Sequence, residues 1–307
     1  MLTHSILLLT SIGIPVLCLF FFPVITREIF KDLRFMRILH YVALALFGFA
    51  IYFSDHDVKG YFLQPDELLV FPLFIIALVY AAIFAIVTNN IADIETDKIS
   101  NTGRPLIKGT VKQAPYLLAG ILCLSYTLIL SLLAHRMMFY SIMMISAGYY
   151  IYSCKPFRLK RIPFIAKLLI GFNSLVVAVC GFVLAGGRLI DFPVDWALFI
   201  LLPLSLAANF VDLKDTAGDS QTGIKTLPVI FGERRAIHLI AFFTICTYLM
   251  AAVIINLLWV YPLCGIMATL HIALLYRKPY KEKPIFLIYI SALFGLNIIL
   301  LFNKYLS

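Results

Sequence analysis

Charged residues are scarce in this sequence. Asp, Glu, Lys and Arg make up only 13% of its 307 residues, about half the fraction usual in soluble domains. The mean hydropathy is +0.98, and several apolar runs reach the roughly 20 residues that a helix needs to cross a bilayer. The composition therefore excludes a soluble globular domain and predicts an all-α, polytopic bundle of transmembrane helices.

Closely spaced cysteines are also missing. The six cysteines stand singly, and the sequence has no CxxC pair: Cys18, Cys123, Cys154, Cys180, Cys246 and Cys264. This spacing argues against a zinc site of paired cysteines and against a disulfide framework. Because no polar domain, low-complexity tail or long linker interrupts the apolar pattern, we interpret residues 1–307 as a single integral-membrane domain.

The apolar residues gather in ten segments. They lie at about 4–25, 36–53, 68–89, 114–134, 136–153, 164–185, 194–212, 235–255, 257–276 and 285–302. The first segment could be a signal peptide, but it has neither a basic n-region nor a small-x-small cleavage site. We therefore interpret it as a further helix.

Lys and Arg are nearly absent from every second loop. The other loops hold 21 of the 25 basic residues: 26–37, 90–113, 154–167, 213–235 and 277–283. The positive-inside rule predicts that these loops face the cytoplasm, as in a multi-pass protein of the inner or cell membrane. The net charge of +9 is then explained by topology and anionic lipid, and a nucleic-acid partner is not expected. The loop at 54–67, on the opposite side, is interpreted as solvated.

An acidic cluster follows the third apolar segment, in the stretch NNIADIETD at 89–97. Asn89, Asp93 and Asp97 are four residues apart, so on a helix they share one face. Glu95 points elsewhere and is interpreted as a solvated charge. A single DxxxD pair at a helix end is usually a solvated cap, so this cluster alone is a weak signal.

A second acidic cluster follows the seventh apolar segment, on the same predicted side of the membrane. Its members are spaced by three, three and four residues, again on one helical face: Asn209, Asp212, Asp215 and Asp219. Gly218 and Gly223 indicate that the helix ends here and a loop begins.

Two such clusters among only 16 acids favour a bound cation. Two carboxylates about 6 Å apart repel by roughly 3 kcal/mol at an effective dielectric near 20, and a cation relieves this repulsion. Oxygen donors alone select Mg²⁺, with Mn²⁺ as a substitute. Because Mg²⁺ usually binds a few carboxylates together with substrate phosphate oxygens, the pattern predicts a phosphorylated substrate, provided that the two clusters converge.

Basic residues near the clusters are candidates for binding that phosphate: Arg104, Lys155, Arg158, Lys214 and Lys225. Cations beside a metal-bound diphosphate would stabilise the charge that develops when it leaves. Lys108, Lys112, Lys160 and Arg161 are interpreted as topology signals alone.

With these residues, the sequence resembles the UbiA superfamily of membrane-embedded prenyltransferases. The first family motif, NxxxDxxxD, matches Asn89, Asp93 and Asp97, and a following RP matches Arg104–Pro105. The second motif, DxxxD with an upstream acid, matches Asp212, Asp215 and Asp219, before a typical GIKTLP at 223–228. Residues 152–161 resemble the basic loop of the family, and the resemblance covers about 36–303.

The resemblance implies nine helices around a central cavity, with both motifs at its cytoplasmic mouth and 4–25 as an extra N-terminal span. Two Mg²⁺ ions would bridge the motif residues and a polyprenyl diphosphate, with four catalytic residues: Asp93, Asp97, Asp215 and Asp219. Ionisation of the diphosphate would give an allylic carbocation in a chamber that excludes water. An acceptor then attacks the cation. An aromatic acceptor, as in quinone biosynthesis, is the first expectation because it is the commonest in the family.

One departure and several alternatives stay open. Many family members carry an acid directly after the first Asn, where this sequence has Asn90, so the role of that position is in doubt. The acceptor could instead be a non-aromatic lipid, such as a glycerol phosphate lipid, or an isoprenoid, and some members are terpene cyclases. A cation transporter would place acids near the bilayer midplane, and no predicted span has one there.

Five further polar residues are candidates for lining the cavity or binding the acceptor: Asn209, Tyr150, Tyr152, Ser153 and Asn173. The two tyrosines are also typical of an interfacial belt, and Asn173 is also typical of a hydrogen bond between helices.

Overall fold

The computed structural model describes residues 2–56 and 65–306. Within this part of the chain every regular element is helical, which confirms the predicted all-α class. Most of the predicted solvated loop at 54–67 lies outside the described residues. The chain forms two compact units, and we describe each by itself: unit 1 is 1–42 with 58–158, and unit 2 is 43–57 with 159–307.

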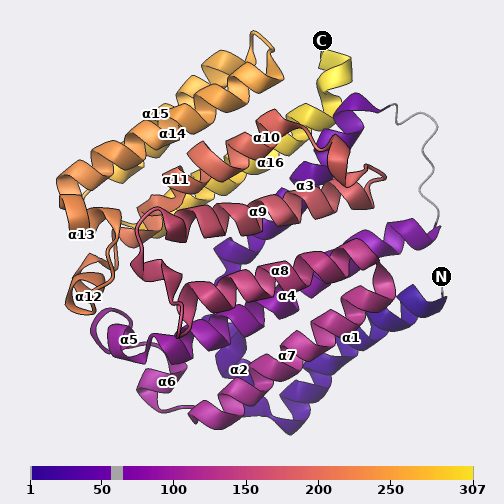
Figure 1. Cartoon of the computed structure of the whole chain (residues 1–307), viewed down its shortest axis with the longest axis vertical. Helices are drawn as coiled ribbons and strands as arrows, with labels where there is room; N and C mark the ends of the chain where they lie inside the picture. Colours follow the sequence, from indigo (N-terminus) through magenta and orange to yellow (C-terminus); the bar gives the residue numbers. More distant parts are fainter. Residues whose placement is uncertain (1, 57–64, 307) are drawn as a thin grey trace. The chain divides into compact units, whose positions relative to one another are not determined.

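Unit 1 contains α1 (Leu2–Phe21), α2 (Pro23–Asp32), α4 (Pro65–Ala92), α5 (Ile94–Ser100), α6 (Pro105–Lys108), α7 (Gln113–Ala134) and α8 (Arg136–Ser153), together with the first part of α3 (Phe35–Asp55). In Figure 1, α4 runs beside α7 and α8, and α1 runs beside α7. Gly120 permits the close approach of α7 to α4, because a Cβ there would stand 2.8 Å from Cγ1 of Val87. The predicted N-terminal span is thus a helix packed on this unit.

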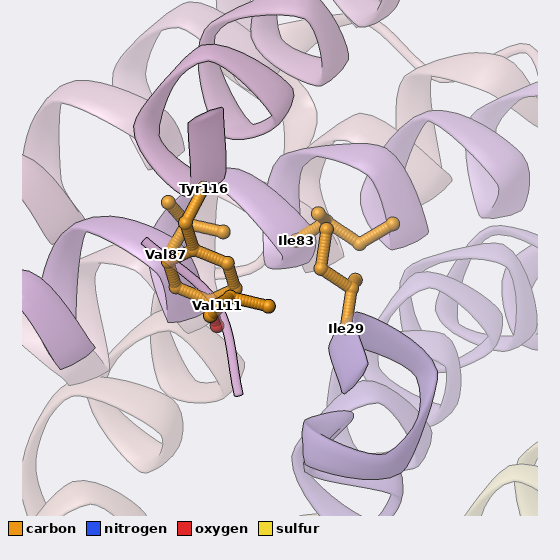
Figure 2. Packing of buried hydrophobic residues seen from close by; sticks show 5 residues of the cluster. All are labelled: Ile29, Ile83, Val87, Val111 and Tyr116. Carbon is orange, nitrogen blue, oxygen red and sulfur yellow. The ribbon is translucent and has the colours of Figure 1, made fainter. Parts of the chain in front are cut away.

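The end of unit 1 where α2 meets the start of α7 has its own apolar core. Figure 2 shows Ile29 of α2 and Tyr116 of α7 in one buried cluster with Ile83, Val87 and Val111. Tyr116 is fully buried. Burial of such side chains contributes about 1.5–3 kcal/mol each, and it fixes α2 against the end of α4.

Unit 2 contains the rest of α3 with α9 (Ile165–Leu184), α10 (Val194–Phe199), α11 (Ser205–Ala207), α12 (Thr216–Gln221), α13 (Leu227–Phe231), α14 (Glu233–Ile255), α15 (Val260–Tyr276) and α16 (Glu282–Leu306). Here α3 and α9 touch backbone to backbone: a Cβ on Gly48 would stand 1.7 Å from the carbonyl oxygen of Ala178. Gly181 meets the Ala45 carbonyl in the same way, at 2.0 Å. Small residues are the usual means of such contact between membrane helices.

The seventh predicted span is one irregular helical run rather than a uniform helix. It begins as α10, widens to a π-helical turn at Ile200–Leu204, continues as α11 and tightens to a 3₁₀ segment at Ala208–Asp212. Pro203 lies in the π-helical turn, and its missing N–H removes one backbone hydrogen bond at that point. The tightening at the end of this run sets the geometry of the second acidic cluster.

Eight helices in the described part of the chain are long and apolar enough to cross a membrane. The predicted spans at 136–153 and 257–276 are helices as well, but they are not among the eight. They correspond to α8, with 18 residues, and α15, with 17. At 1.5 Å per residue, α15 rises about 26 Å, slightly short of the roughly 30 Å of hydrocarbon. The α8 helix is long enough to be counted among the eight, so it is excluded by its less apolar composition, which includes Arg136 and several tyrosines.

Candidate functional site

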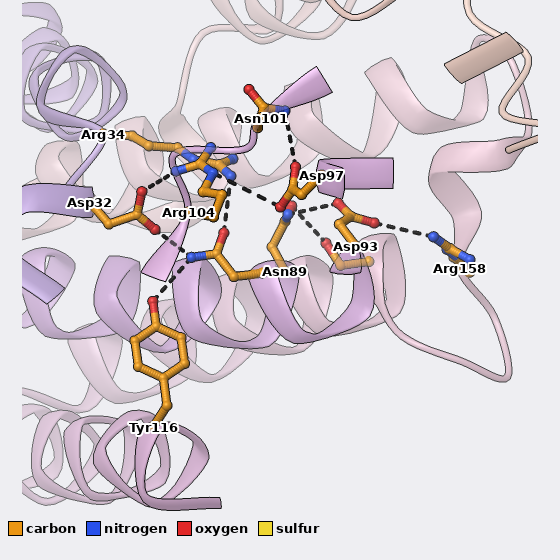
Figure 3. A network of polar contacts seen from close by, with 11 residues as sticks. Asp32, Arg34, Asn89, Asp93, Asp97, Asn101, Arg104, Tyr116 and Arg158 are labelled. Carbon is orange, nitrogen blue, oxygen red and sulfur yellow. Dashed lines mark hydrogen bonds and ion pairs between the residues drawn. The ribbon is translucent and has the colours of Figure 1, made fainter. Parts of the chain in front are cut away.

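The first acidic cluster lies where α4 gives way to α5. Asp93 stands between the two helices, with φ −107° and ψ 12°. The helical hydrogen-bond pattern nevertheless continues, since the Asp93 N–H donates to the Asn89 carbonyl at 2.9 Å and the Asp97 N–H donates to the Asp93 carbonyl at 2.8 Å. Because each bond spans four residues, the spacing of four keeps the three side chains on one side, as predicted (Figure 3).

Asp93 lies at the centre of a chain of polar contacts. Its Oδ2 accepts a hydrogen bond from Asn89 Nδ2 at 2.8 Å, and its Oδ1 pairs with Arg158 Nη2 at 3.2 Å. The same Arg158 nitrogen donates to the Ala92 carbonyl at 3.2 Å. Ser153 Oγ donates to Asn89 Oδ1 at 3.3 Å. Four residues proposed from the sequence, Asn89, Asp93, Ser153 and Arg158, therefore form one network.

Asp97 is 5% exposed and less completely balanced by its neighbours. Asn101 Nδ2 donates to its Oδ1 at 2.9 Å, and Arg104 Nε stands 3.9 Å from its Oδ2. Within the described residues, Oδ2 accepts no hydrogen bond. Burial raises the pKa of this carboxyl above its usual value, against the opposing effects of Arg104 and Asn101.

A buried group that the sequence analysis missed adjoins this cluster. Asp32, at the end of α2, receives hydrogen bonds from Arg104 Nη1 and Asn90 Nδ2. Asn90 is 1% exposed, and its Nδ2 also donates to the Tyr116 hydroxyl at 3.0 Å. Arg34 Nη2 reaches Asn90 Oδ1 at 3.5 Å. No motif spacing points to Asp32, because it lies 57 residues before the first Asn of the motif.

The second acidic cluster follows a different backbone. The Asp215 N–H donates to the Asp212 carbonyl at 3.2 Å, a bond that spans three residues, whereas the Asp219 N–H donates to the Asp215 carbonyl at 2.9 Å. Residues three apart eclipse in a 3₁₀ helix. The change of spacing from three to four thus follows the change from the 3₁₀ segment to α12. Of the two glycines expected to mark the end of the helix, Gly218 lies inside α12, whereas α12 does end at Gln221, just before Gly223 with its φ of 69°.

The second cluster combines three neighbouring carboxylates with two lysines. Lys167 Nζ pairs with Asp212 Oδ1 at 2.9 Å, while Asp212 Oδ2 accepts no hydrogen bond in the described part of the chain. Burial, and then repulsion from Asp212 and Asp215, raise the pKa of Asp219 to about 7. Lys160 and Lys167 oppose that shift. These two lysines are the cations that lower the pKa of Asp219.

Several sequence-based candidates are more exposed than the aspartates of the clusters. Lys155 and Lys225 are exposed, and Lys214 forms an ion pair with Glu282. Tyr150 is 43% exposed, as a belt residue would be. Tyr152 is half-buried.

The two predicted polar groups in unit 2 are both buried. Asn209 is 3% exposed and donates to the Leu206 carbonyl at 2.7 Å, so its amide satisfies the 3₁₀ run instead of joining the aspartates. Asn173 is 1% exposed, and its Oδ1 accepts no hydrogen bond within the described residues. This orphaned oxygen leaves Asn173 as a candidate for binding.

Two lysines were underrated from the sequence. Lys160, interpreted as a topology signal, is only 7% exposed, and Lys167, which received no role, is 4% exposed. A signal for Lys167 existed, because a lysine two residues inside α9 is costly in an apolar helix unless a partner compensates it.

An apolar cavity of about 310 Å³ lies inside unit 2, lined by α14, α15, α16 and the helical run at 199–207. Its polar lining includes Thr244, Tyr248, His271 and Tyr289. His271 is 2% exposed; its Nδ1 stands 3.4 Å from the Tyr248 hydroxyl, and its Nε2 has no hydrogen-bond partner among the described residues. The size and lining suit a hydrocarbon group.

The donor chemistry of both clusters fits Mg²⁺. Asp97 and Asp212 each present a buried oxygen that accepts no hydrogen bond in the part of the chain that the structure describes. The donors are carboxylate and amide oxygens, which hard cations prefer. Within the described part of the chain, no group of three His, Cys, Asp or Glu side chains could hold a metal ion without further ligands. Substrate or water oxygens would have to complete the coordination, as is usual for Mg²⁺.

Comparison with known proteins agrees with this arrangement. A sequence model of the UbiA prenyltransferase family matches residues 58–297, most of the chain. The chain belongs to the UbiA prenyltransferase family. Together with its apolar helices, membership identifies it as an integral multi-pass membrane protein. The match begins after α1, α2 and α3, so it does not include the segment that carries Asp32.

Curated relatives are digeranylgeranylglyceryl phosphate synthases. The protein of this name from Thermococcus gammatolerans is 28% identical over 160 residues, which is 52% of this chain and 56% of the relative. The one from Methanopyrus kandleri is 27% identical over 158 residues, or 51% and 56%. The chain therefore matches just over half the length of these relatives.

Solved structures share the fold. A UbiA homologue from Archaeoglobus fulgidus bound to GPP and Mg²⁺ aligns with a TM-score of 0.66 at 16% identity, covering 89% of this chain and 99% of the other. The apo structure of a UbiA homologue from Aeropyrum pernix K1 aligns with a TM-score of 0.67 at 16% identity, covering 86% and 97%. At these identities the likeness concerns the fold alone.

Proposed function

We propose that the protein transfers a prenyl group from a polyprenyl diphosphate to an acceptor in a Mg²⁺-dependent reaction. The observation that carries the proposal is the pair of family-matched clusters with buried carboxylate oxygens that accept no hydrogen bond, Asp97 Oδ2 and Asp212 Oδ2. The bound Mg²⁺ and GPP of the Archaeoglobus homologue support the same chemistry for this family member. Six residues of the two clusters would hold two Mg²⁺ ions: Asn89, Asp93, Asp97, Asp212, Asp215 and Asp219.

The residues around the clusters suit the departure of a diphosphate. Mg²⁺, when bound, would neutralise the charge on the diphosphate oxygens. Arg158 and Arg104 would donate N–H groups to the same oxygens and stabilise the leaving group as its C–O bond breaks. Asp93 holds the Arg158 guanidinium in place through their ion pair at 3.2 Å, and Asn101 holds the Asp97 carboxylate through a hydrogen bond at 2.9 Å. The allylic cation would form among apolar helices that exclude water.

We place a glycerol phosphate lipid before an aromatic ring as the acceptor. The relatives are named for digeranylgeranylglyceryl phosphate, and this name favours the non-aromatic alternative over the aromatic acceptor expected from the sequence. A hydroxybenzoate-type ring, as in quinone biosynthesis, stays as the second candidate. A cyclisation without any acceptor is the third.

One experiment separates these outcomes. Purified protein in detergent is incubated with Mg²⁺ and labelled dimethylallyl, geranyl, farnesyl or geranylgeranyl diphosphate. Each donor is tested with geranylgeranylglyceryl phosphate, with a hydroxybenzoate and without acceptor, and the products are analysed by mass spectrometry. We expect a prenylated glycerol phosphate lipid that disappears with a chelator.

The other outcomes correct or reject the proposal. A prenylated ring would correct the acceptor, and cyclic hydrocarbon alone would replace transfer by cyclisation. If no donor releases diphosphate in the presence of Mg²⁺, the proposed function is wrong.

We also propose that both clusters face the cytoplasm. The proposal is based on the excess of basic residues in the loops around the clusters. Cysteines introduced at the exposed Lys98 and Lys225, in a variant without native cysteines, should react with a membrane-impermeant maleimide only when the cytoplasmic side is accessible. Labelling from the opposite side would reverse the orientation.

A further inference from the structure

We propose that Asp32 on α2 is a positioning residue for Arg104, and that the N-terminal segment thereby completes the first half of the site. The proposal rests on the proposed function in one respect, since it takes Arg104 as a ligand of the diphosphate. It adds a residue outside the family-matched range of 58–297.

The contacts of Asp32 use both carboxylate oxygens. Oδ1 accepts from Arg104 Nη1 (Figure 3). Oδ2 accepts from Asn90 Nδ2. The Arg104 and Asp32 side chains are 18% and 10% exposed. A charge-assisted pair in such surroundings is screened little by water. Asp32 is therefore anchored to α4 through Asn90 and to the loop before α6 through Arg104.

Packing holds the carboxylate in this place. Asp32 is the last residue of α2, and Ile29, one turn earlier, is buried in the cluster with Ile83, Val87 and Tyr116. The Tyr116 hydroxyl meets the same Asn90 amide that donates to Asp32. The end of α2 and the Asn90 amide are both held in place by this core. The Asp32 carboxylate, and with it the position of the Arg104 guanidinium, is therefore fixed as well.

The consequence for Arg104 is a guanidinium held between two acids. Its Nη1 is bound to Asp32, while its Nε stands 3.9 Å from Asp97 Oδ2 and makes no hydrogen bond among the described residues. Without Asp32, Arg104 would be drawn fully onto Asp97 and would compete with a cation for that oxygen. Asp32 therefore keeps Asp97 available and leaves guanidinium N–H groups directed at the cluster.

The position of the charge explains the unusual Asn90. Members of the family often have an acid there, and this chain has an amide that donates to Asp32. The negative charge absent from position 90 is thus present one hydrogen bond away, on a different helix. Arg37 and Arg104 repel the Arg34 guanidinium, whereas Asp32 attracts it, so this charge also offsets part of that repulsion.

The test moves the charge and follows Arg104 function. Asp32→Asn should lower kcat/KM for the prenyl diphosphate about tenfold or more, mainly through KM, because a misplaced Arg104 no longer meets the diphosphate. The double variant Asp32→Asn/Asn90→Asp returns the carboxylate to α4 and should recover most of that loss. Diphosphate binding in the presence of Mg²⁺, measured by calorimetry, should change in parallel.

Glu28→Gln is the matched control. Glu28 lies one turn earlier on α2 and pairs with Lys31 at 2.6 Å and Thr110 at 3.2 Å, so its loss should leave KM within about twofold of the wild-type value. Thermal unfolding of each variant reports on folding separately from KM. The double variant still lacks Asp32. If its KM recovers, the KM of Asp32→Asn therefore rose because a negative charge was missing near Arg104, and not because α2 was disturbed.

The overturning results are distinct from failure of the proposed function. If the wild-type protein turns over prenyl diphosphate and Asp32→Asn leaves KM unchanged, the positioning role is wrong. It is also wrong if the double variant regains thermal stability but not KM. If the wild-type protein neither binds diphosphate nor turns over any donor, the proposed function fails first and this role fails with it.

Discussion

The two acidic clusters differ in how their charge is balanced. In the first cluster, Asp93 pairs with Arg158. Asp97 accepts a hydrogen bond from Asn101, and Nε of Arg104 lies 3.9 Å from its Oδ2. In the second, Lys167 pairs with Asp212 at 2.9 Å. Burial is the largest effect that raises the pKa of both Asp97 and Asp219. The next largest effect at Asp97 is Arg104, which lowers the pKa, whereas at Asp219 it is repulsion from Asp212 and Asp215, which raises the pKa against the opposing effects of Lys160 and Lys167.

This difference predicts separate roles for the two acidic clusters. Guanidinium and amide donors already organise the first cluster, so its side chains need little rearrangement to meet a diphosphate. In the second cluster, Asp212 and Asp215 repel the buried Asp219 carboxylate, and a bound cation would relieve this repulsion. We therefore expect the second cluster to depend more on Mg²⁺ for its stability, and the first to contribute more direct contacts to the phosphate.

Removing one central aspartate from either cluster should have the largest effect. Asp93→Ala and Asp215→Ala should each lower Mg²⁺-dependent turnover by about 100-fold or more, because each takes a carboxylate from a proposed ion site. Turnover is measured as diphosphate release. Glu95→Ala is the matched control, since Glu95 is 77% exposed and pairs only with Lys98 in the contacts that the structure describes. Full activity in either aspartate variant would contradict the assignment.

Combining the two changes tests whether the clusters act as one site. If they do, Asp93→Asn/Asp215→Asn should be little worse than either single variant, because residues that act as a unit lose function non-additively. Kinetic constants of all four proteins give the coupling energy directly. Multiplication of the two single losses would mean that the clusters act independently.

Arg158 offers a smaller and more specific test of the first cluster. Its backbone has φ 44°, a left-handed conformation that is strained for a residue with a long side chain. In this conformation the guanidinium donates to Asp93 Oδ1 and to the Ala92 carbonyl. Arg158→Lys should lower kcat/KM about tenfold, because a flexible lysine ammonium lacks the planar guanidinium that directs Nη2 at both oxygens and leaves further N–H groups for the diphosphate. Arg161→Lys, at an exposed position in the same loop, should change it little. Equal effects of both would reduce Arg158 to a general surface charge.

The helical class and the motif residues could be predicted from the sequence because they depend on local patterns. Apolar length identifies the spans, and the spacings of four at 89–97 and of three and four at 212–219 match the backbone hydrogen bonds that the structure shows. The π-helical turn at Ile200–Leu204 was not predicted, although Pro203 marks where regular bonding has to change.

The missed residues share a physical reason. Asp32, Lys160 and Lys167 act through partners far away in sequence, and nothing in a single chain's spacing reports a contact of 45 residues or more, such as that between Lys167 and Asp212. Lys214 was misjudged in the opposite direction: it adjoins the second motif, yet its charge is directed to Glu282. Proximity in sequence to a motif is a poor guide for long, flexible side chains.

The smallest expected effect concerns Asp219 and distinguishes the charge balance of the two clusters. Asp219→Asn removes one of three mutually repelling carboxylates while keeping the shape of the side chain. In a chelator, the variant should unfold about 2–4 °C above the wild type, because roughly 1 kcal/mol of repulsion is relieved. Asp93→Asn should instead lower the unfolding temperature, since it leaves Arg158 without its anionic partner. Thermal unfolding in detergent, with and without Mg²⁺, measures both. Mg²⁺ should also stabilise the Asp219 variant less than the wild type, and a loss of stability in that variant under chelation would show that the second cluster is as well balanced as the first.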